Sequence, residues 1–303
     1  MQALYDVPAP AKLNLFLHVI GKRPDGYHLL ESIFALIDWA DTLHFERRGD
    51  GLLQRHDSEG ANLPPDDLCL RAARALQQAS GCGFGADIHI DKRLPAGAGM
   101  GGGSSDAAST LLALNRLWGL DWSLQKLKEL GLSLGADVPF FLGGTHAFVE
   151  GIGEILHPVT LPEQRFAVVK PAASIATKEI FSSSLLAMSK SVAIVAGFPA
   201  HNSSENKTVD VTRYLDGFGK NDLQKAAEAA SDDVVQALEL LETKFGNSRM
   251  TGSGSAVFAR VVQENGKSDP AMATMLQEAI PAGWQGRICR SLEHHPLKGW
   301  ARD

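Results

Sequence analysis

Five glycines stand within the seven positions from Gly97 to Gly103, in the stretch LPAGAGMGGGSSDAAS that runs from Leu94 to Ser109. Apolar residues at helical spacing follow directly, so the glycines lead into the start of a predicted helix. A helix start carries unpaired backbone N–H groups and partial positive charge, and glycines let phosphate oxygens approach those donors. The stretch predicts a phosphate-binding loop. The alternative is a tight turn that only lets a strand pack against a helix.

Known nucleotide-binding patterns narrow the type of loop. Gly97, Gly99 and Gly102 match the spacing of the dinucleotide fingerprint, but Asp121, at the expected place for its acidic residue, falls at a predicted helix start. A Walker A loop needs a lysine where Ser104 stands, and the protein-kinase motifs HRD and DFG do not occur. The sequence therefore predicts a phosphate-binding loop without its own lysine, and a dinucleotide-dependent oxidoreductase is the weakest alternative.

Phosphoryl transfer also requires a cation near the transferred group and a carboxylate that orients or deprotonates the acceptor hydroxyl. Lys12 opens the first predicted strand, Lys92 lies just before the glycines, and Asp137 stands in the turn GADVP. Each has another interpretation when taken alone. Lys12 could be a solvated strand end, and Asp137 could stabilise its turn.

Alternating and helical patterns predict the elements that must position these residues. KLNLFLHVI, from Lys12, alternates as a half-buried strand, and further strands are predicted from Ser32 and from Thr42. PPDDLCLRAARALQQASG has a helix-start proline and a helix-stop glycine, and the strand from Ala86 to Leu94 runs into the glycines. The predicted order around the loop is strand, glycine loop, helix.

The second half has the same mixed character. It contains a predicted strand RFAVVKP, a stretch from Ser182 to Thr212 that is hard to assign, a long helix from about Asp222 to Phe245, a turn TGSGS before the strand AVFARVV, a helix from Asp269, and a last strand in GWQGRICRSL. Regular βαβ alternation is missing, which predicts an α+β fold. The length and a change of composition near Leu156 predict two domains, residues 1–157 and 158–303.

Composition excludes several classes of protein. A net charge of −6 and a pI near 5.9 argue against a general nucleic-acid-binding surface. No apolar run reaches the roughly 18 residues of a membrane helix, and the N-terminus lacks the pattern of a secretory signal, so we expect a cytoplasmic protein without membrane contact. The three cysteines lack metal-ligand spacing.

Three stretches together resemble, in order and spacing, the sequence motifs of the GHMP kinases. They are PAKLNLFL near the N-terminus, LPAGAGMGGGSSDAA in the middle and TGSGSAVFA from Thr251. PAKLNLFLHVIGKRPDGYHLLES and LGADVPFFLGGTHAFVEGIGE are similar to the motifs of the members that phosphorylate 4-diphosphocytidyl-2-C-methyl-D-erythritol with ATP in the non-mevalonate isoprenoid pathway. The resemblance implies a two-domain fold, with an N-terminal domain like ribosomal protein S5 and a C-terminal ferredoxin-like α/β sandwich.

The resemblance also implies roles for individual residues. Lys12 and Asp137 match the catalytic lysine and aspartate of that family, and ATP, with Mg²⁺ whose ligands stay unknown, would be the phosphoryl donor. The residues implied at the nucleotide are Lys92, Pro95, Ala96, Gly97, Ala98, Gly99, Met100, Gly101, Gly102, Gly103, Ser104 and Ser105, with Lys92 beside adenine. The residues implied at the substrate are Asn14, Tyr27, His28 and Phe181, with Tyr27 and Phe181 stacking on the cytosine of its cytidine diphosphate group.

One residue departs from the family pattern, and two further alternatives stay open. Asp67 stands where the family often has an asparagine that helps to hold adenine, and an aspartate lacks the amide donor. A GHMP kinase for an amino acid or a mevalonate-type alcohol would share the loop but should lack Tyr27 and His28. An RNA-binding module with the same N-terminal fold is the other alternative, which the acidic balance and the pair Lys12 and Asp137 disfavour.

Overall fold

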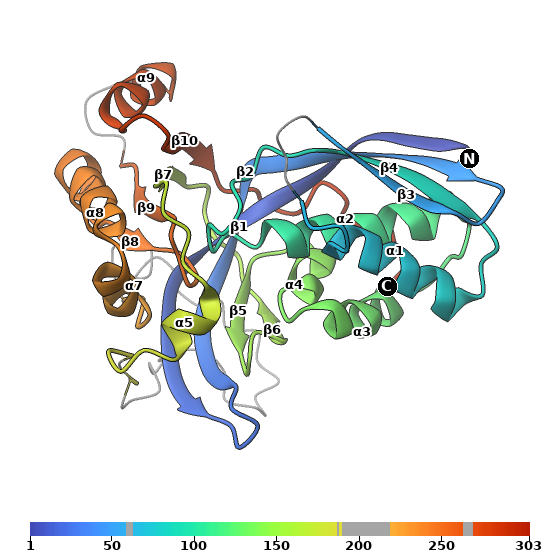
Figure 1. Cartoon of the computed structure of the whole chain (residues 1–303), viewed down its shortest axis with the longest axis horizontal. Helices are drawn as coiled ribbons and strands as arrows, with labels where there is room; N and C mark the ends of the chain where they lie inside the picture. Colours follow the sequence, from blue (N-terminus) through green and yellow to red (C-terminus); the bar gives the residue numbers. More distant parts are fainter. Residues whose placement is uncertain (59–62, 187, 190–218, 263–268) are drawn as a thin grey trace.

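The computed structural model of the chain describes residues 1–303 except 59–62, 187, 190–218 and 263–268. Its strands form two sheets of six and four strands with helices beside them, which confirms the predicted α+β class (Figure 1). The six-stranded sheet contains β1 (Ala3–Lys22), β2 (His28–Arg48), β3 (Leu53–Asp57), β4 (Gly85–Asp91), β5 (Ala147–Glu150) and β6 (Ile155–Pro158). The four-stranded sheet has the order β10 (Gln285–Arg290), β7 (Arg165–Lys170), β9 (Val257–Arg260), β8 (Arg249–Met250).

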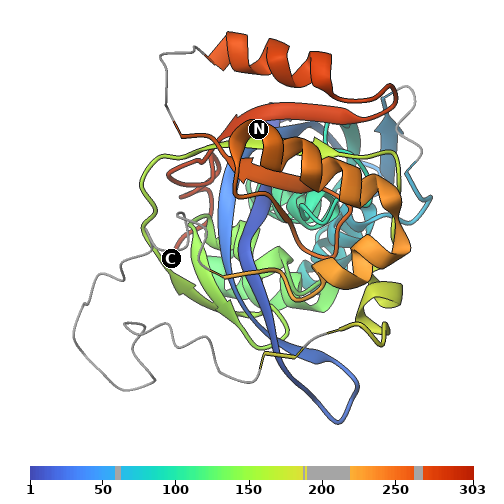
Figure 2. The same ribbon diagram turned by 90° about the vertical axis from the view of Figure 1, so that its left-hand side faces the viewer.

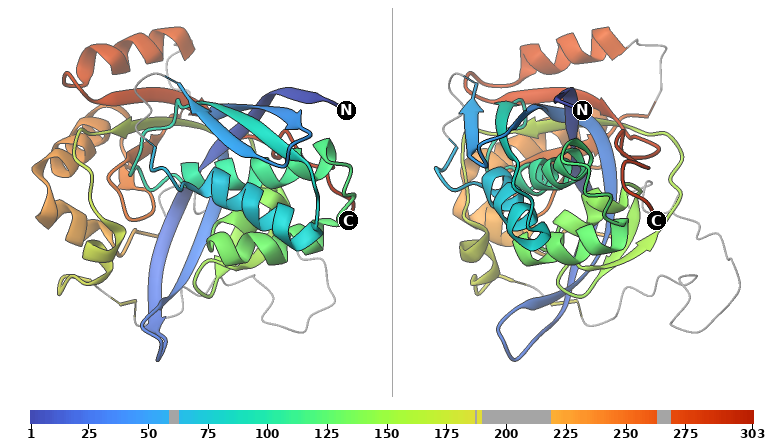
Figure 3. Two further views of the ribbon diagram at one scale, coloured as in Figure 1. Left: turned by 45° about the vertical axis from the view of Figure 1, so that its right-hand side comes forward. Right: turned by 90° about the vertical axis from the view of Figure 1, so that its right-hand side faces the viewer.

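The described helices flank these sheets. They are α1 (Leu68–Ser80), α2 (Gly102–Leu117), α3 (Leu124–Leu134), α4 (Val138–Gly143), α5 (Thr177–Phe181), α7 (Gln224–Ala230), α8 (Asp232–Phe245) and α9 (Asp269–Ala279). Helices α1 to α4 lie together on one side of the six-stranded sheet, and α7 to α9 lie with the four-stranded sheet (Figures 1 and 3). The glycine stretch therefore joins β4 to α2, in the predicted order of strand, loop and helix.

The hairpin of β1 and β2 connects the two halves of the molecule. Its strands pair antiparallel, and they extend from the six-stranded sheet past the elements of the second half (Figures 1 and 2). Leu13 and Leu15 pack in one apolar cluster with Phe258 of the second sheet, whereas Leu17 and Val19 pack in another that includes helices of the second half. Asn14 and His18, which the alternation placed on the exposed face, are buried as well. Thr251 and Lys220 of the second half contact them. The prediction of a half-buried strand was therefore wrong.

The strands predicted separately from Ser32 and from Thr42 are one continuous strand, β2. Residues 28–48 contain no glycine or proline, so nothing in this stretch forces the chain to turn. Irregularities in the pairing of β1 with β2, such as the shift between Pro10 and Lys12, interrupt the register instead.

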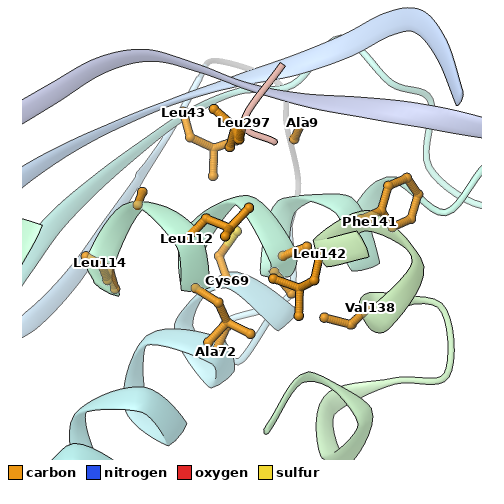
Figure 4. Close-up of a cluster of buried hydrophobic side chains, with 14 of the residues drawn as sticks. Ala9, Leu43, Cys69, Ala72, Leu112, Leu114, Val138, Phe141, Leu142 and Leu297 are labelled. Carbon is orange, nitrogen blue, oxygen red and sulfur yellow. The ribbon is translucent and has the colours of Figure 1, made fainter. Parts of the chain in front are cut away.

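A compact apolar core lies between the six-stranded sheet and helices α1, α2 and α4 (Figure 4). Cys69 of α1, Leu112 of α2 and Leu142 of α4 point toward one another there, with Leu43 of β2 above them (Figure 4). Leu297 joins the same core although it lies near the C-terminus. This packing fixes the direction of α2, and with it the direction of the backbone N–H groups at its start.

The last residues of the chain return to the first sheet and its helices. Bridges join Ser291 to Ile37 and Arg302 to Ser123, and both termini lie at the same end of the molecule in Figure 1. The chain passes from the first sheet to the second after β6. The predicted division into residues 1–157 and 158–303 stays a prediction.

The single helix predicted from about Asp222 to Phe245 was wrong. Two helices, α7 and α8, cover this range, and Ser231 between them has extended backbone angles of φ −158° and ψ 119°. Ser231 precedes Asp232 and Asp233, and a serine followed by acidic residues in the first turn is typical of a helix start. Most of the stretch that is hard to assign, from Ser182 to Thr212, lies outside the described residues.

Candidate active site

A cavity of about 510 Å³ opens where β1, the glycine loop and α4 meet elements of the second half. Its lining consists of Lys12, Asn14, Leu17, Gly26, Tyr27, His28, Leu30, Phe34, Gly99, Gly101, Asp137, Ile152, Gly153, Thr177, Phe181, Leu223, Gly252 and Ser253. Every residue implied at the substrate and both implied catalytic residues belong to this set. Among these implied residues, Lys12 and Phe181 are the farthest apart in the sequence, by 169 positions (181 − 12).

Lys12 lies in the middle of β1 and is only 4% exposed, so it is not a solvated strand end. Its Nζ donates to Asn14 Oδ1 at 2.5 Å, lies 3.9 Å from Asp137 Oδ2 and sits 4.5 Å above the centre of the Phe34 ring. Burial lowers the pKa of Lys12, and the charge of Asp137 acts in the opposite direction. A desolvated cation facing a carboxylate is an arrangement suited to stabilising a transferring phosphoryl group.

Asp137 occupies the residue before α4, where the chain changes from a turn to a helix. Its side chain is 30% exposed and makes no capping hydrogen bond to the helix, which leaves its oxygens available to the cavity. Gly153 lies opposite, where a Cβ atom would stand 3.6 Å from Asp137 Oδ1. The turn-stabilising interpretation of Asp137 therefore finds no support in its contacts.

The glycines of the loop differ in what requires them. Gly97, Gly99 and Gly101 have φ angles of +62°, +72° and +73°, a conformation that side chains with a Cβ rarely adopt. Gly101 is the N-cap residue of α2, where a Cβ would approach Phe141 to 3.0 Å. Gly103, in the first turn of α2, is exposed, and a Cβ there would touch only Leu68, at 3.4 Å. Packing explains Gly101, whereas no contact with the described residues requires glycine at 103.

Gly99 is needed because the turn between β8 and β9 passes directly over it. A Cβ on Gly99 would lie 2.3 Å from the carbonyl oxygen of Thr251, and a Cβ on Gly252 would lie 2.5 Å from that of Gly99. Backbone N–H groups of Ser255 and Ala256 donate to carbonyls of the loop, at 3.1 and 3.2 Å. The TGSGS turn therefore packs against the glycine loop and is hydrogen-bonded to it. Two of its residues, Gly252 and Ser253, also line the cavity.

Several loop residues implied at the nucleotide face the protein interior. Ala98 and Met100 are buried, and the Met100 carbonyl accepts a hydrogen bond from the Lys12 amide at 3.0 Å. The hydroxyl of Ser105 donates to the Pro10 carbonyl at 2.7 Å, and Ser105 is fully buried. Ser105 thus ties the start of α2 to β1. Its side chain lies outside the cavity lining.

Lys92 lies beside the helix start within a buried cluster of charges. Its Nζ contacts Asp41 and lies 2.7 Å from Asp106 Oδ2, and it is absent from the cavity lining. Burial alone would lower the pKa of Lys92, but Asp106 and Asp41 outweigh it and raise that pKa. Asp41 also accepts the backbone N–H groups of Arg93 and Leu94. In this structure Lys92 thus anchors the strand end that precedes the glycine loop.

Asp67 has structural partners that explain an aspartate there. It is the N-cap residue of α1, where its side chain accepts from Leu70 N at 3.1 Å. Its Oδ1 also lies 2.7 Å from Arg55 Nη1 of β3. Asp67 therefore satisfies a helix start and a buried arginine at once.

The aromatic residues implied at the substrate, Tyr27 and Phe181, line the same cavity as Gly101. His28 stacks on Phe181 with ring centres 5.1 Å apart and planes at 24°, whereas Tyr27 is 61% exposed. Burial lowers the pKa of His28, and the charge of Lys22 lowers it further, so the ring is neutral at pH 7. The ring partner of Phe181 in this structure is thus His28, and the exposed face of Tyr27 is available to a ligand.

Sequence comparison matches two family descriptions to this chain, "GHMP kinases N terminal domain" over residues 67–145 and "GHMP kinases C terminal" over residues 209–282. The 4-diphosphocytidyl-2-C-methyl-D-erythritol kinase of Methylibium petroleiphilum is 61% identical over 301 residues, which cover 99% of each chain. The chain belongs to the 4-diphosphocytidyl-2-C-methyl-D-erythritol kinase family. The enzyme of that name from Verminephrobacter eiseniae is 56% identical over 308 residues, 100% of this chain and 99% of the relative.

Solved structures agree with membership of this kinase family. A crystal structure of 4-(cytidine 5'-diphospho)-2C-methyl-D-erythritol kinase superposes with a TM-score of 0.72 at 30% identity, covering 95% of this chain and 98% of the other. The homoserine kinase from Cytophaga hutchinsonii gives a TM-score of 0.67 at 16% identity over 97% and 95% of the two chains, which shows a shared fold. The predicted two-domain GHMP kinase fold and a small-molecule kinase are thereby confirmed.

Sequence reasoning missed several residues of the 4-diphosphocytidyl-2-C-methyl-D-erythritol kinase site. Thr177 and Ser253 both line the cavity, and their hydroxyl oxygens are hydrogen-bonded at 2.8 Å. Asn221 donates to the carbonyls of Met250 and Gly252, both at 2.8 Å, and so holds the turn that supports the glycine loop. A buried polar residue in a segment without a clear pattern gives no signal in one sequence, because its partners are distant along the chain.

Proposed function

We propose that this chain transfers the γ-phosphoryl group of ATP to the 2-hydroxyl of 4-diphosphocytidyl-2-C-methyl-D-erythritol, a reaction of the non-mevalonate isoprenoid pathway. The observation that carries the proposal is that one cavity contains Lys12 beside Asp137, the cap of α2 at Gly101, and the aromatic residues Tyr27 and Phe181. The full-length similarity to relatives of that name supports the same substrate.

The nucleotide would bind with its phosphates at the start of α2. The N–H groups of the first helical turn are unpaired by helix geometry and carry partial positive charge. Gly103 carries no side chain that could cover them, and the turn at Thr251 holds the loop in shape. This arrangement positions a triphosphate through backbone groups and needs no lysine in the loop.

Asp137 would accept the proton of the 2-hydroxyl as its oxygen forms a bond to the γ-phosphorus and the bond from that phosphorus to the bridging oxygen of ADP breaks. Lys12 would offset negative charge on the transferred group, and its distance of 3.9 Å to Asp137 also favours the ionised carboxylate. General-base assistance of this kind is worth roughly 10² to 10⁴ in rate.

Magnesium would accompany ATP and neutralise charge on its phosphates. Within the described residues no three His, Cys, Asp or Glu side chains gather in a way that could hold a metal ion. Mg²⁺ in kinases is held largely by phosphates and water with one or two protein carboxylates. Asp137 is the carboxylate among the described cavity-lining residues, and its role at the acceptor hydroxyl would leave the phosphates and water as the main Mg²⁺ ligands.

The cytidine group would occupy the end of the cavity at Tyr27, His28 and Phe181. Stacking of a base on an aromatic ring is worth about 1 to 3 kcal/mol, and Tyr27 presents its ring to solvent. A neutral His28 has one nitrogen that donates and one that accepts, which suits the mixed edge of cytosine.

Release of ADP tests the proposal directly. Purified protein with ATP and Mg²⁺ should release ADP with the cytidine diphosphate substrate at least a hundredfold faster than with homoserine, mevalonate or galactose at equal concentration. A preference for any of those three would contradict the proposed substrate while leaving the kinase family unchanged. The proposal keeps the expectation of a cytoplasmic enzyme, and no helix among the described residues is long and apolar enough to span a membrane.

A further inference from the structure

The turn after β8 reaches the residue next to the cavity lysine through a side chain. Thr251 is fully buried, and its Oγ1 accepts the backbone N–H of Asn14 at 2.9 Å. The same oxygen lies 3.3 Å from Asn14 Oδ1, to which its proton is donated. These contacts join two residues that are 237 positions apart. They connect the second half of the chain to the strand that carries Lys12.

The network leaves one orientation for the amide of Asn14. The hydroxyl of Ser32 donates its only proton to the Phe16 carbonyl at 2.5 Å, so it can only accept from Asn14. Asn14 Nδ2 is the donor in that contact, at 2.9 Å. Oδ1 must then face Lys12 and Thr251, both of which donate to it. Ser32 on one side and Thr251 on the other therefore fix the amide.

The position of the Lys12 ammonium depends on that amide. Of its described neighbours, Asn14 Oδ1 at 2.5 Å is within hydrogen-bond distance, whereas Asp137 Oδ2 lies at 3.9 Å. The ring of Phe34 covers a further side of the ammonium. With Lys12 only 4% exposed, bulk water offers little alternative support. An acceptor held in place thus determines where the charge lies.

We propose that Thr251 is a positioning residue for Lys12 and acts through Asn14. The position of the turn between β8 and β9 would then determine the position of the Lys12 ammonium. The inference rests on the proposed function only for the consequence on turnover. The geometry of the ammonium is independent of which alcohol is phosphorylated.

The hydroxyl of Thr251 can be removed without unseating the turn. The backbone of the turn has its own contacts, from Thr251 N to the Ala256 carbonyl at 3.0 Å and from Gly254 N to the Thr251 carbonyl at 3.0 Å. Asn221 holds its neighbouring carbonyls as well. A valine keeps the branched shape of threonine and loses only the hydroxyl. Thr251→Val therefore isolates the contact with Asn14.

The test compares Thr251→Val with Thr251→Ser, which keeps the hydroxyl, and with Ser255→Ala as a matched control. Ser255 is equally buried in the same turn, but its hydroxyl donates to the Ala173 carbonyl, away from Lys12. We expect Thr251→Val to lower kcat about tenfold with the KM for ATP changed by less than about twofold, the signature of a contribution made in the transition state. Serine should restore most of the loss, and Ser255→Ala should not reproduce it.

A second measurement needs no phosphoryl acceptor. The rate at which acetic anhydride labels Lys12 at pH 8, followed by peptide mass spectrometry, reports the fraction of Lys12 that is a neutral amine. In Thr251→Val the labelling should be about threefold faster than in the unaltered chain, because a less fixed acceptor favours the ammonium less. This readout separates the two claims. Faster labelling without any turnover of the cytidine substrate would support the inference and contradict the proposed function.

Two results would overturn the inference. One is a Thr251→Val protein with the labelling rate and kcat of Thr251→Ser. The other is an additive loss when Thr251→Val is combined with Asn14→Ala, because a residue that acts through Asn14 has no further effect once that side chain is gone. If a thermal melt of the valine variant shows no unfolding transition, Thr251→Ala removes the same hydroxyl and is judged by the same criteria.

Discussion

Replacing Gly103 with alanine separates a glycine kept for a ligand from one kept for packing. Gly103 is exposed in the first turn of α2, and the added Cβ would meet only Leu68 Cδ1, at 3.4 Å. Alanine also favours a helix over glycine by about 0.5 to 1 kcal/mol, so the free energy of unfolding should stay unchanged or rise. The methyl group would nevertheless stand where a phosphate must approach the helix N–H groups. We expect the affinity for an ATP analogue to fall about tenfold, or 1.4 kcal/mol.

Gly99→Ala should behave in the opposite way. Its φ of +72° costs a residue with a Cβ about 1 to 2 kcal/mol. Its Cβ would lie 2.3 Å from the Thr251 carbonyl oxygen, and overpacking of this kind adds about 1 to 3 kcal/mol. Gly81→Ala is the matched control, because Gly81 has a φ of +67° with nothing within 4 Å of the added atom. The excess destabilisation of Gly99→Ala over Gly81→Ala measures the clash alone.

Chemical denaturation and calorimetric titration with a non-hydrolysable ATP analogue give both quantities for each variant. Unimpaired binding by Gly103→Ala would refute the assignment of the helix start to the phosphates. A Gly99→Ala protein as stable as Gly81→Ala would refute the packing argument for the turn over the glycine loop.

Three further predictions concern the elements around the cavity. Asp67→Ala should lower the free energy of unfolding by about 1 kcal/mol or more, through loss of the α1 cap and of the partner of Arg55, and Asp67→Asn should lose less because it keeps the cap; urea denaturation measures both. Burial lowers the pKa of His146 and of His295 to about 4, below the ordinary 6.5, so the unfolded chain binds more protons between those values. The stability that these rings contribute is complete above pH 6.5 and is lost as the pH falls toward 4, by at most about 3 kcal/mol each, and His146→Asn should flatten that slope in denaturation series from pH 7 to pH 4. Phe181→Ala should raise the KM for the cytidine substrate about tenfold with the KM for ATP unchanged, and a KM rise for ATP of equal size in steady-state assays would contradict a base-stacking role.

Local signals in the sequence were enough for the loop and its helix. Glycines before an apolar helical pattern predict a helix start that is open to an anion, and the structure places Gly101 at the cap of α2. Lys12 and Asp137 were linked only through the family resemblance, because no local pattern relates residues 125 positions apart (137 − 12). The structure now places them 3.9 Å apart in one cavity.

The missed features are those that depend on long-range packing. The face of β1 that carries Asn14 and His18 is buried because residues of the second half contact it, which an alternating pattern in one strand cannot reveal. Sequence reasoning did not reveal that Asp41 and Asp106, from other elements, hold the Lys92 ammonium in a cluster of charges, and its expected place beside adenine stays a prediction. The break at Ser231 has a local signal, a serine before two aspartates, which the prediction of a single helix did not use.

The central claim is that Asp137 acts on the acceptor hydroxyl while ATP is held elsewhere, at the glycine loop. Asp137→Asn keeps the size and the hydrogen-bonding oxygen of the side chain but removes its negative charge. We predict that single-turnover transfer of the γ-phosphoryl group to the cytidine substrate falls by roughly 10² to 10⁴ while the Kd for ATP changes by less than about threefold. A transfer rate near that of the unaltered chain, or a loss explained by ATP binding alone, would contradict the account.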